Sequence, residues 1–325
     1  MKRRQALAVL GGAPLAAWSG AARAQAPAWP DRPVKIVVPF GPGGSTDIMS
    51  RVMAKFLETA TGQPFVIENK PGATGMIGTT QVKHAPADGY TLLFASSSTM
   101  AANPWLYKTM TYDPEDFTQV AVTGTTANFM LVNKDAPYKT VKEFVAFAKT
   151  RKPGELFSGY GNASSRVPAA LFEQHSGVKF EEVAYRDAPA SIQDLAAGRV
   201  HAVFPDQVVS ESYVRSGMVR ALAVTSAQRS PRYPDVEAIA ETFPGYDIVA
   251  FGGLGVRKET PPALKVRINA LLNESLKDAA IAARFADLGM AIPTPPWDID
   301  TCVAFVRRER EAWGKYIKLA KIEPQ

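Results

Sequence analysis

The segment Val34–Asp47 reads VKIVVPFGPGGSTD, and it decides the fold class. Its first part, Val34–Val38, is an almost continuous apolar run, which is typical of a strand buried on both faces of a sheet. Glycines and a proline then end the strand, and Asp47–Thr59 carries its apolar side chains on one helical face. A buried strand, a Gly-rich turn and an amphipathic helix in this order predict a parallel α/β sheet.

The same alternation of short β-rich runs and helical patterns continues along the chain. Two more strands are predicted over Pro64–Glu68 and Tyr90–Ala95, with a helix over Gly75–His84 between them. A second series has strands over Phe129–Val132, Leu156–Ser158, Phe180–Ala184 and Val200–Phe204, alternating with helices over Val141–Lys149, Val167–His175 and Ala190–Ala197. Further β-rich runs cover Arg220–Val224 and Ile248–Gly255, and the tail is predicted to be helical over Pro261–Leu288 and Asp298–Leu319.

Length and composition limit the classes of protein. A chain of 325 residues suggests two domains or one large one, and 46% hydrophobic with 21% charged residues excludes a disordered or collagen-like chain. The single cysteine, Cys302, excludes a disulfide framework, and its spacing from apolar residues in the last helix predicts a core position. Without the four cations of residues 1–24, 33 Lys and Arg face 31 Asp and Glu, a net charge of +2. Such a balance does not favour a nucleic-acid partner.

The N-terminus has the pattern of an export signal. Met1–Arg4 is cationic, Ala6–Trp18 is mostly apolar, and Ala22-Arg23-Ala24 fits a small-x-small cleavage site. We therefore expect a signal peptide over residues 1–24, cut between Ala24 and Gln25, and a mature protein in the periplasm. The apolar stretch is shorter than the roughly 20 residues of a membrane-spanning helix. Two adjacent arginines in the first segment leave the twin-arginine route open beside the general secretory route.

Most motifs of covalent or metal-dependent catalysis are missing from the sequence. It contains no G-x-S-x-G nucleophile elbow and no P-loop lysine, and the Gly41–Thr46 turn lacks the third glycine of a dinucleotide fingerprint. The histidines His84, His175 and His201 stand apart from one another, so they offer no clustered metal ligands. We predict no catalytic residues, no metal and no cofactor.

Polar turns follow three of the predicted strands. Gly41–Asp47, Ala95–Thr99 and Gly159–Arg166 are rich in glycine, serine and threonine. A Gly-rich turn at a helix N-terminus can present several backbone N–H groups to an anion, although Ser45 or Thr46 could equally be a simple helix N-cap. Because ligands of open α/β sheets lie at the carboxyl ends of strands, turns from two series favour one cleft between two lobes.

These residues also carry a family resemblance that covers the whole mature sequence. The chain resembles the Bug (TctC-like) periplasmic solute receptors of tripartite tricarboxylate transporters. The shared landmarks, in order, are Trp29–Pro33, Val38–Asp47, Glu68–Ala73, Pro86–Leu92, Ser96–Thr99, Tyr112–Phe117, Ala221–Ser226 and Pro244–Tyr246.

The resemblance implies a two-lobed, type-II-like binding protein in which each lobe is a mostly parallel sheet flanked by helices. We expect domain I over residues 25–127 plus 247–325 and domain II over 128–246, with hinge strands near Ala127–Val132 and Tyr246–Phe251. A small carboxylate would be held in the cleft between them, mainly by backbone and hydroxyl groups. The expected ligand-binding residues are Phe40, Gly41, Gly44, Ser45, Thr46, Asp47, Ser97, Ser98, Ser165, Arg166, Tyr185, Arg186 and Asp206.

Three positions in the second half depart from the family pattern. Arg166 stands where many relatives have histidine, Arg186-Asp187 replaces Lys-Gly, and Asp206 is displaced by one position behind Pro205. In one interpretation Arg186–Asp187 is a solvated surface pair and Arg166 is a surface residue at the start of a helix. Alternatively, one arginine makes a bidentate contact with the ligand carboxylate.

The function predicted from the sequence is capture of a carboxylated solute for a membrane permease. The partners would be the ligand and the permease subunits, and the protein would be a monomer that does not bind nucleic acid. A receptor that presents its ligand to a sensor kinase is an alternative, and a periplasmic enzyme acting in the cleft is an alternative of another class.

Overall fold

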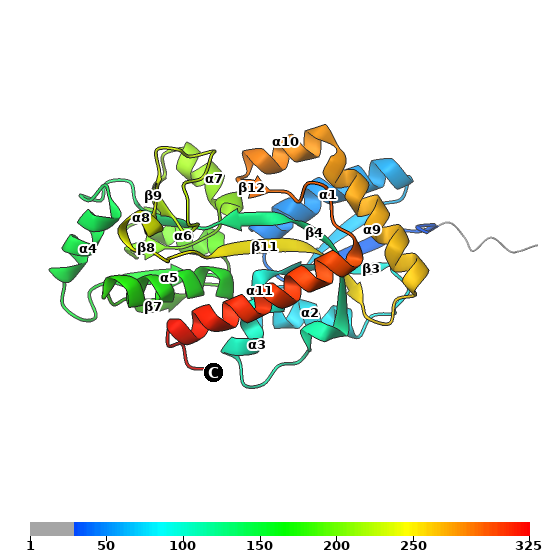
Figure 1. Ribbon diagram of the computed structural model, residues 1–325, viewed down its shortest axis with the longest axis horizontal. Coiled ribbons are helices and arrows are strands. Elements are labelled where there is room, and N and C mark those ends of the chain that lie inside the picture. The colour runs from blue at the N-terminus through cyan, green and yellow to red at the C-terminus, as the bar shows by residue number, and fades with distance from the viewer. Residues whose placement is uncertain (1–28) are drawn as a thin grey trace, which may run out of the picture.

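The computed structural model describes residues 29–325, so the predicted signal peptide lies outside the described residues. Within residues 29–325 the strands form two six-stranded sheets, which lie toward opposite ends of an elongated molecule (Figure 1). We call the part built on the first sheet lobe I and the part built on the second sheet lobe II. The predicted α/β fold with two lobes is confirmed.

Lobe I has the strand order β12-β4-β11-β3-β1-β2. Its strands are β1 (Val34–Val38), β2 (Phe65–Asn69), β3 (Thr91–Ser96), β4 (Phe117–Ala127), β11 (Val249–Arg257) and β12 (Met290–Ala291). The pairs β1–β2 and β1–β3 are parallel, whereas β11 is antiparallel to both β3 and β4, and β12 is antiparallel to β4. The other four strands therefore point the same way, as a mostly parallel sheet requires. Helices of this lobe are α1 (Ser45–Thr61), α2 (Met76–Lys83), α3 (Asn103–Leu106), α9 (Pro262–Lys277) and α10 (Ala279–Asp287). The lobe also has the short 3-10 helices η1 (Ala73–Gly75) and η3 (Pro114–Asp116) and the π-helix η2 (Ser97–Ala102).

Lobe II has the strand order β10-β9-β5-β8-β6-β7. Among the described strands of this sheet, β5 is antiparallel and the other five run in one direction. Its strands are β5 (Phe129–Asn133), β6 (Phe157–Tyr160), β7 (Glu181–Ala184), β8 (Ala202–Val203), β9 (Val219–Val224) and β10 (Glu237–Ala238). Its helices are α4 (Val141–Lys149), α5 (Ala163–Ser176), α6 (Ala188–Ala196), α7 (Gln207–Arg215) and α8 (Ile239–Thr242).

The chain passes between the lobes beside the longest strands. β4 ends at Ala127 in the sheet of lobe I, and β5 begins at Phe129 in the sheet of lobe II. The chain returns where the Ile248 N–H donates to the Thr225 carbonyl at 3.0 Å and β11 begins opposite Ala127. Figure 1 shows β4 and β11 side by side along this crossing, and the terminal helix α11 (Ile299–Leu319) spans the two lobes below them.

Asn128 joins the two strands at the first crossing. Its side-chain amide donates to the Ser164 carbonyl at 3.0 Å and to the Phe204 carbonyl at 2.6 Å, while its backbone N–H donates to the Thr225 hydroxyl at 2.8 Å. One buried side chain therefore ties the crossing to the start of α5 and to the end of β8.

Several elements were not predicted, among them β4, α7 and the short elements α3, α8, β10 and β12, and one predicted helix is divided in two. β4 was not predicted, because its threonines and the glycine at position 124, with φ of +150°, hide the strand pattern. The helix predicted over Pro261–Leu288 is two helices, because the Asp278 side chain accepts hydrogen bonds from the N–H groups of Ala280 and Ile281 and starts α10 anew.

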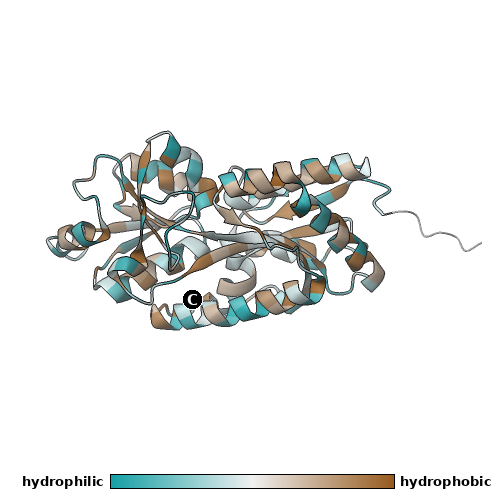
Figure 2. Ribbon diagram, turned by 45° about the horizontal axis from the view of Figure 1, so that its top comes forward, coloured by the Kyte–Doolittle hydropathy of each residue, from teal (hydrophilic) through white to brown (hydrophobic). Residues whose placement is uncertain are grey.

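Apolar side chains fill the space between sheets and helices. The strands in Figure 2 are largely brown and white, and the surrounding helices combine brown with teal residues. One core cluster extends from lobe I into lobe II and includes Trp313 of α11. Cys302 is fully buried in the same cluster, as predicted, and burial raises the pKa of its thiol to about 11.

Candidate ligand-binding cleft

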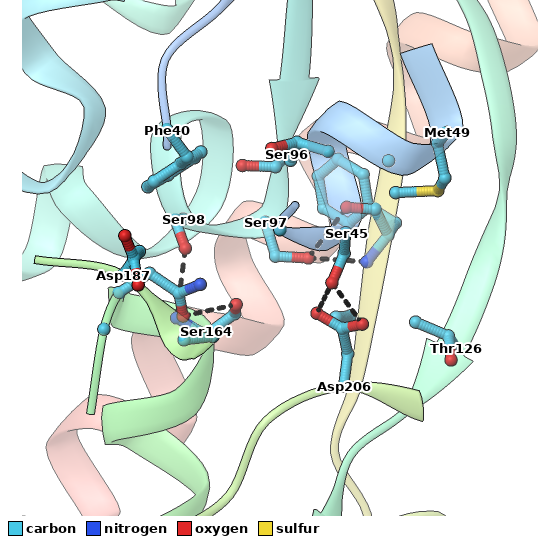
Figure 3. A pocket seen from close by; sticks show the side chains of 18 of the residues that line it. Phe40, Ser45, Met49, Ser96, Ser97, Ser98, Thr126, Ser164, Asp187 and Asp206 are labelled. Atoms are coloured by element: carbon cyan, nitrogen blue, oxygen red, sulfur yellow. Dashed lines mark hydrogen bonds between the residues drawn. The ribbon is translucent and has the colours of Figure 1, made fainter. Parts of the chain in front are cut away.

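A small polar cavity lies between the lobes, with about 40 Å³ of free space (Figure 3). Lobe I contributes the β1–α1 loop and the first residues of η2, and lobe II contributes the starts of α5, α6 and α7. Thr126 of β4 and Ala250–Gly252 of β11 complete the lining beside the crossing. The polar turns predicted from the sequence therefore meet at one place.

Four helices of nine or more residues begin at this cavity. Their N-cap residues, Gly44 for α1, Asn162 for α5, Asp187 for α6 and Asp206 for α7, all line it. The three caps of lobe II accept a hydrogen bond from a backbone N–H of their own helix through the side chain. Gly44 has no side chain with which to do so, so the first turn of α1 has no side-chain cap. Its N–H groups and the positive end of its dipole are left for another acceptor.

Two hydrogen bonds hold the lobes together across the cavity. The Ser45 hydroxyl donates to the Asp206 carboxylate, with oxygen–oxygen distances of 2.5 and 2.6 Å, and the Ser164 N–H donates to the Ser98 hydroxyl at 3.0 Å. Burial raises the pKa of Asp206 above its ordinary value, and the bonds from Ser45 and the α7 backbone offset only part of that effect. The cleft therefore contains a carboxyl group with an increased affinity for a proton.

Ser97 is held in place by lobe I itself. The Phe251 N–H donates to its hydroxyl at 2.6 Å, and that hydroxyl lies 3.3 Å from the Phe251 carbonyl oxygen. This pair of contacts joins η2 to β11 at the cavity wall.

Asp47 lies behind the β1–α1 loop and does not line the cavity. Its carboxylate accepts hydrogen bonds from the Gly43 N–H at 2.9 Å, the Arg51 Nε at 3.0 Å and the Asn69 amide at 3.0 Å. Burial acts to raise the pKa of Asp47, but these three donors outweigh it and hold the pKa below its ordinary value. Asp47 therefore fixes the loop whose other residues face the cavity.

The structure brings together most of the expected residues of lobe I and few of those of lobe II. Ser165 is buried beside the cavity, where its hydroxyl donates to the Asn162 carbonyl at 3.0 Å and accepts from the Gly161 N–H at 3.3 Å. Its neighbour Ser164 lines the cavity instead. The expected residues that do line the cavity are Phe40, Gly41, Gly44, Ser45, Thr46, Ser97, Ser98 and Asp206.

Arg166, Tyr185 and Arg186 line a second, larger cavity of about 370 Å³. The Arg166 guanidinium makes a bidentate pair with Glu182, at 2.8 Å from Nε and 2.7 Å from an Nη, and its side chain is only 14% exposed. The Arg186 side chain is 87% exposed, and its Nε lies 3.2 Å from the Asp187 carboxylate. Neither arginine lines the first cavity. Arg186 forms the exposed pair with Asp187 that one interpretation expected, whereas the expected surface position of Arg166 is wrong, because its side chain is largely buried against Glu182.

Several residues of the cleft were missed by sequence reasoning. Asn162 could have been found, because asparagine three residues before Ser165 is a standard N-cap pattern, and its Oδ1 accepts from the Ser165 N–H at 2.9 Å. Thr126 of the cavity wall and Asn128 at the crossing carry no such local signal, since their place depends on how the strands cross between lobes.

A two-lobed α/β fold that encloses a polar cavity is the architecture of a solute-binding protein. The family profile described as "Tripartite tricarboxylate transporter family receptor" (TctC) matches residues 49–321. The chain therefore belongs to this family of periplasmic receptors and is a receptor rather than an enzyme. None of the helices in residues 29–325 is long and apolar enough to cross a membrane, and no cluster of three potential metal-binding side chains occurs among those residues.

Individual relatives agree with the family match. Protein BugT of Bordetella pertussis is 32% identical over 305 residues, which is 92% of each chain. Among solved structures, R. palustris Rpa4515 with adipate is 33% identical, with a TM-score of 0.88 over 91% of this chain and 100% of that one. MatC (Rpa3494) from Rhodopseudomonas palustris with bound malate is 28% identical, with a TM-score of 0.83 over 89% of this chain and 100% of that one.

Proposed function

We propose that this receptor is exported to the periplasm, captures a small carboxylate between its lobes and delivers it to the membrane subunits of a tripartite permease. The observation that carries the proposal is the N-terminus of α1, which has no side-chain cap and opens into a polar cavity shared by both lobes. Family membership supports the transport role, and two solved relatives hold adipate and malate.

The ligand carboxylate would sit at the first turn of α1. There it accepts hydrogen bonds from the backbone of Ser45 and Thr46 and from the hydroxyls of Ser45, Ser97 and Ser98. Hydrogen bonds to a charged group are worth about 1.5–3 kcal/mol each, and the helix dipole adds to them. The other three helix N-termini carry their own side-chain caps, so α1 is the position left for a ligand.

Ligand binding would be coupled to protonation of Asp206. A ligand carboxylate that takes the Ser45 hydroxyl places a second negative charge near a buried carboxyl whose pKa is already raised. Two neighbouring carboxylates favour protonation of one of them. Binding would therefore draw a proton onto Asp206.

Closure and release would use the crossing between the lobes. Domain I would comprise residues 25–127 plus 247–325 and domain II residues 128–246, in agreement with the sheet to which each strand belongs. The two bonds across the cleft, from Ser45 to Asp206 and from Ser164 to Ser98, are those that opening must break. We take the protein to be a monomer that needs no cofactor.

The direct test is a thermal-shift screen of the mature protein against mono-, di- and tricarboxylates, with the corresponding amides as controls. A ligand that binds only the folded state raises Tm in proportion to the logarithm of its concentration over Kd. We expect at least one acid to raise Tm while its amide does not. If every acid leaves Tm unchanged at millimolar concentration, the proposal fails.

A further inference from the structure

The first cavity is too small to hold more than the acidic end of a ligand. Its free space of about 40 Å³ compares with about 150 Å³ for an apolar cavity that binds benzene. The second cavity, of about 370 Å³, adjoins it, and Phe40, Gly161 and Asn162 line both. These three shared residues make the second cavity the best-connected space into which the remainder of a ligand bound at α1 can extend past Phe40.

Aromatic side chains from both lobes surround the second cavity. Phe40 and Tyr107 come from lobe I, and Tyr160 comes from lobe II. Tyr185 also belongs to the lining, but its hydroxyl donates to Asp194 of α6 at 2.9 Å, so its ring packs toward that helix. No aspartate or glutamate is among its lining residues in the described part of the chain. Aromatic walls of this kind favour a flat ring, which can stack on them or meet them edge to face.

The two arginine side chains at the second cavity already have carboxylate partners in the protein. Arg166 has its guanidinium on Glu182 and lies 5.4 Å from the centre of the Tyr160 ring, while Arg186 is paired with Asp187. Since both arginines have carboxylate partners, the cavity does not require a second acidic group from the ligand.

One wall of the second cavity is held in an unusual backbone conformation. Ala73 and Thr74 have φ of +46° and +52°, which side-chain-bearing residues rarely adopt. The Thr74 carbonyl accepts from the Asn103 amide at 3.0 Å, and the Thr74 hydroxyl lies 2.6 Å from the Tyr107 hydroxyl. Such strain persists where surrounding contacts enforce it, often at ligand clamps. Here the contacts fix the Tyr107 ring at the cavity.

We infer that the second cavity receives an aromatic ring and that this receptor prefers ring-bearing carboxylates to short aliphatic acids. The inference rests on the proposed function, since it assumes that the ligand carboxylate lies at α1. The ring would lie beyond Phe40, between the tyrosines of the two lobes.

The first test compares affinities by calorimetry. Benzoate, phenylacetate and 3-phenylpropionate are measured against acetate, succinate and malate. We expect the best ring acid to bind at least tenfold tighter than any of the short acids. If a short acid binds equally well or better, the inference is wrong while carboxylate capture stands. If neither group binds at millimolar concentration, carboxylate capture fails as well.

The second test fills the cavity from an exposed position. Ala184 is the last residue of β7, pairs with Tyr160 and lines the second cavity. Ala184→Trp should weaken the best ring acid at least tenfold and leave the best-binding short acid within twofold. Ala197→Trp, at an exposed alanine of the same lobe that lines neither cavity, is the matched control.

Folding is checked by circular dichroism and Tm. If Ala184→Trp does not fold, Tyr107→Ala replaces it, with the same expected tenfold loss for the ring acid. Unchanged affinity for the ring acid in whichever folded variant is measured would overturn the inference.

Discussion

Gly44→Val should abolish carboxylate binding without unfolding the protein. Gly44 has φ of −78° and ψ of 168°, an extended conformation that valine adopts readily. A Cβ at this position would meet the Gly41 carbonyl oxygen at 3.5 Å, an ordinary contact. The substitution is therefore compatible with the fold, yet it adds three carbon atoms at a cavity with about 40 Å³ of free space.

The expected loss follows from the hydrogen bonds that the valine would block. Two backbone donors to a carboxylate contribute about 3–6 kcal/mol together, and 1.4 kcal/mol corresponds to a factor of ten in Kd. We expect affinity for the best ligand of the thermal-shift screen to fall at least a hundredfold by calorimetry. Thr59→Val, at the exposed opposite end of α1, is the control and should bind as the wild type does. A folded Gly44→Val protein with affinity within twofold of wild type would show that the α1 N-terminus does not hold the ligand.

Three further predictions concern charge and export. Burial raises the pKa of Asp206, so the folded protein holds this proton to higher pH than the unfolded chain, and the carboxyl destabilises the fold as pH rises through the raised pKa. Asp206→Asn keeps a helix N-cap but removes the charge. The Tm of this variant should exceed that of the wild type by at least about 2 °C at pH 8 and equal it near pH 3.5. If the two proteins have the same Tm at pH 8, Asp206 is not a buried ionised carboxylate. The Arg186 side chain is 87% exposed, so Arg186→Gln should leave Tm within about 1 °C and carboxylate affinity within twofold of the wild-type values. A hundredfold loss of affinity would show that Arg186 contacts the ligand. N-terminal sequencing of periplasmic protein should begin at or near Gln25, and conversion of Arg3-Arg4 to Lys-Lys blocks export only if the twin-arginine route is used.

Local patterns predicted the part of the site that one segment builds. In Gly41–Asp47 the strand, the turn and the helix start follow one another directly, so the sequence indicates both the loop and the helix end that it exposes. It also places serines after β3, because the hydroxyl-rich run begins where the apolar run stops.

Local sequence patterns could not predict the contacts between segments that are distant in the chain. Asp206 is 161 residues from Ser45, and nothing near either residue indicates that they meet across the cleft. In the same way, the sequence around Arg166 does not indicate that Glu182 of strand β7 pairs with its guanidinium. The choice between Ser164 and Ser165 depended on the rotation of α5, which the amide of Asn128 helps to set through the Ser164 carbonyl.

A crystal structure of the protein with a bound carboxylate would test the central claim most directly. We predict that one carboxylate oxygen lies within about 3.2 Å of the backbone nitrogen of Ser45 or Thr46, and that Ser97 or Ser98 donates a hydroxyl hydrogen bond to the same group. A carboxylate held instead by Arg166 or Arg186 in the second cavity, with the first turn of α1 still unoccupied, would contradict the account.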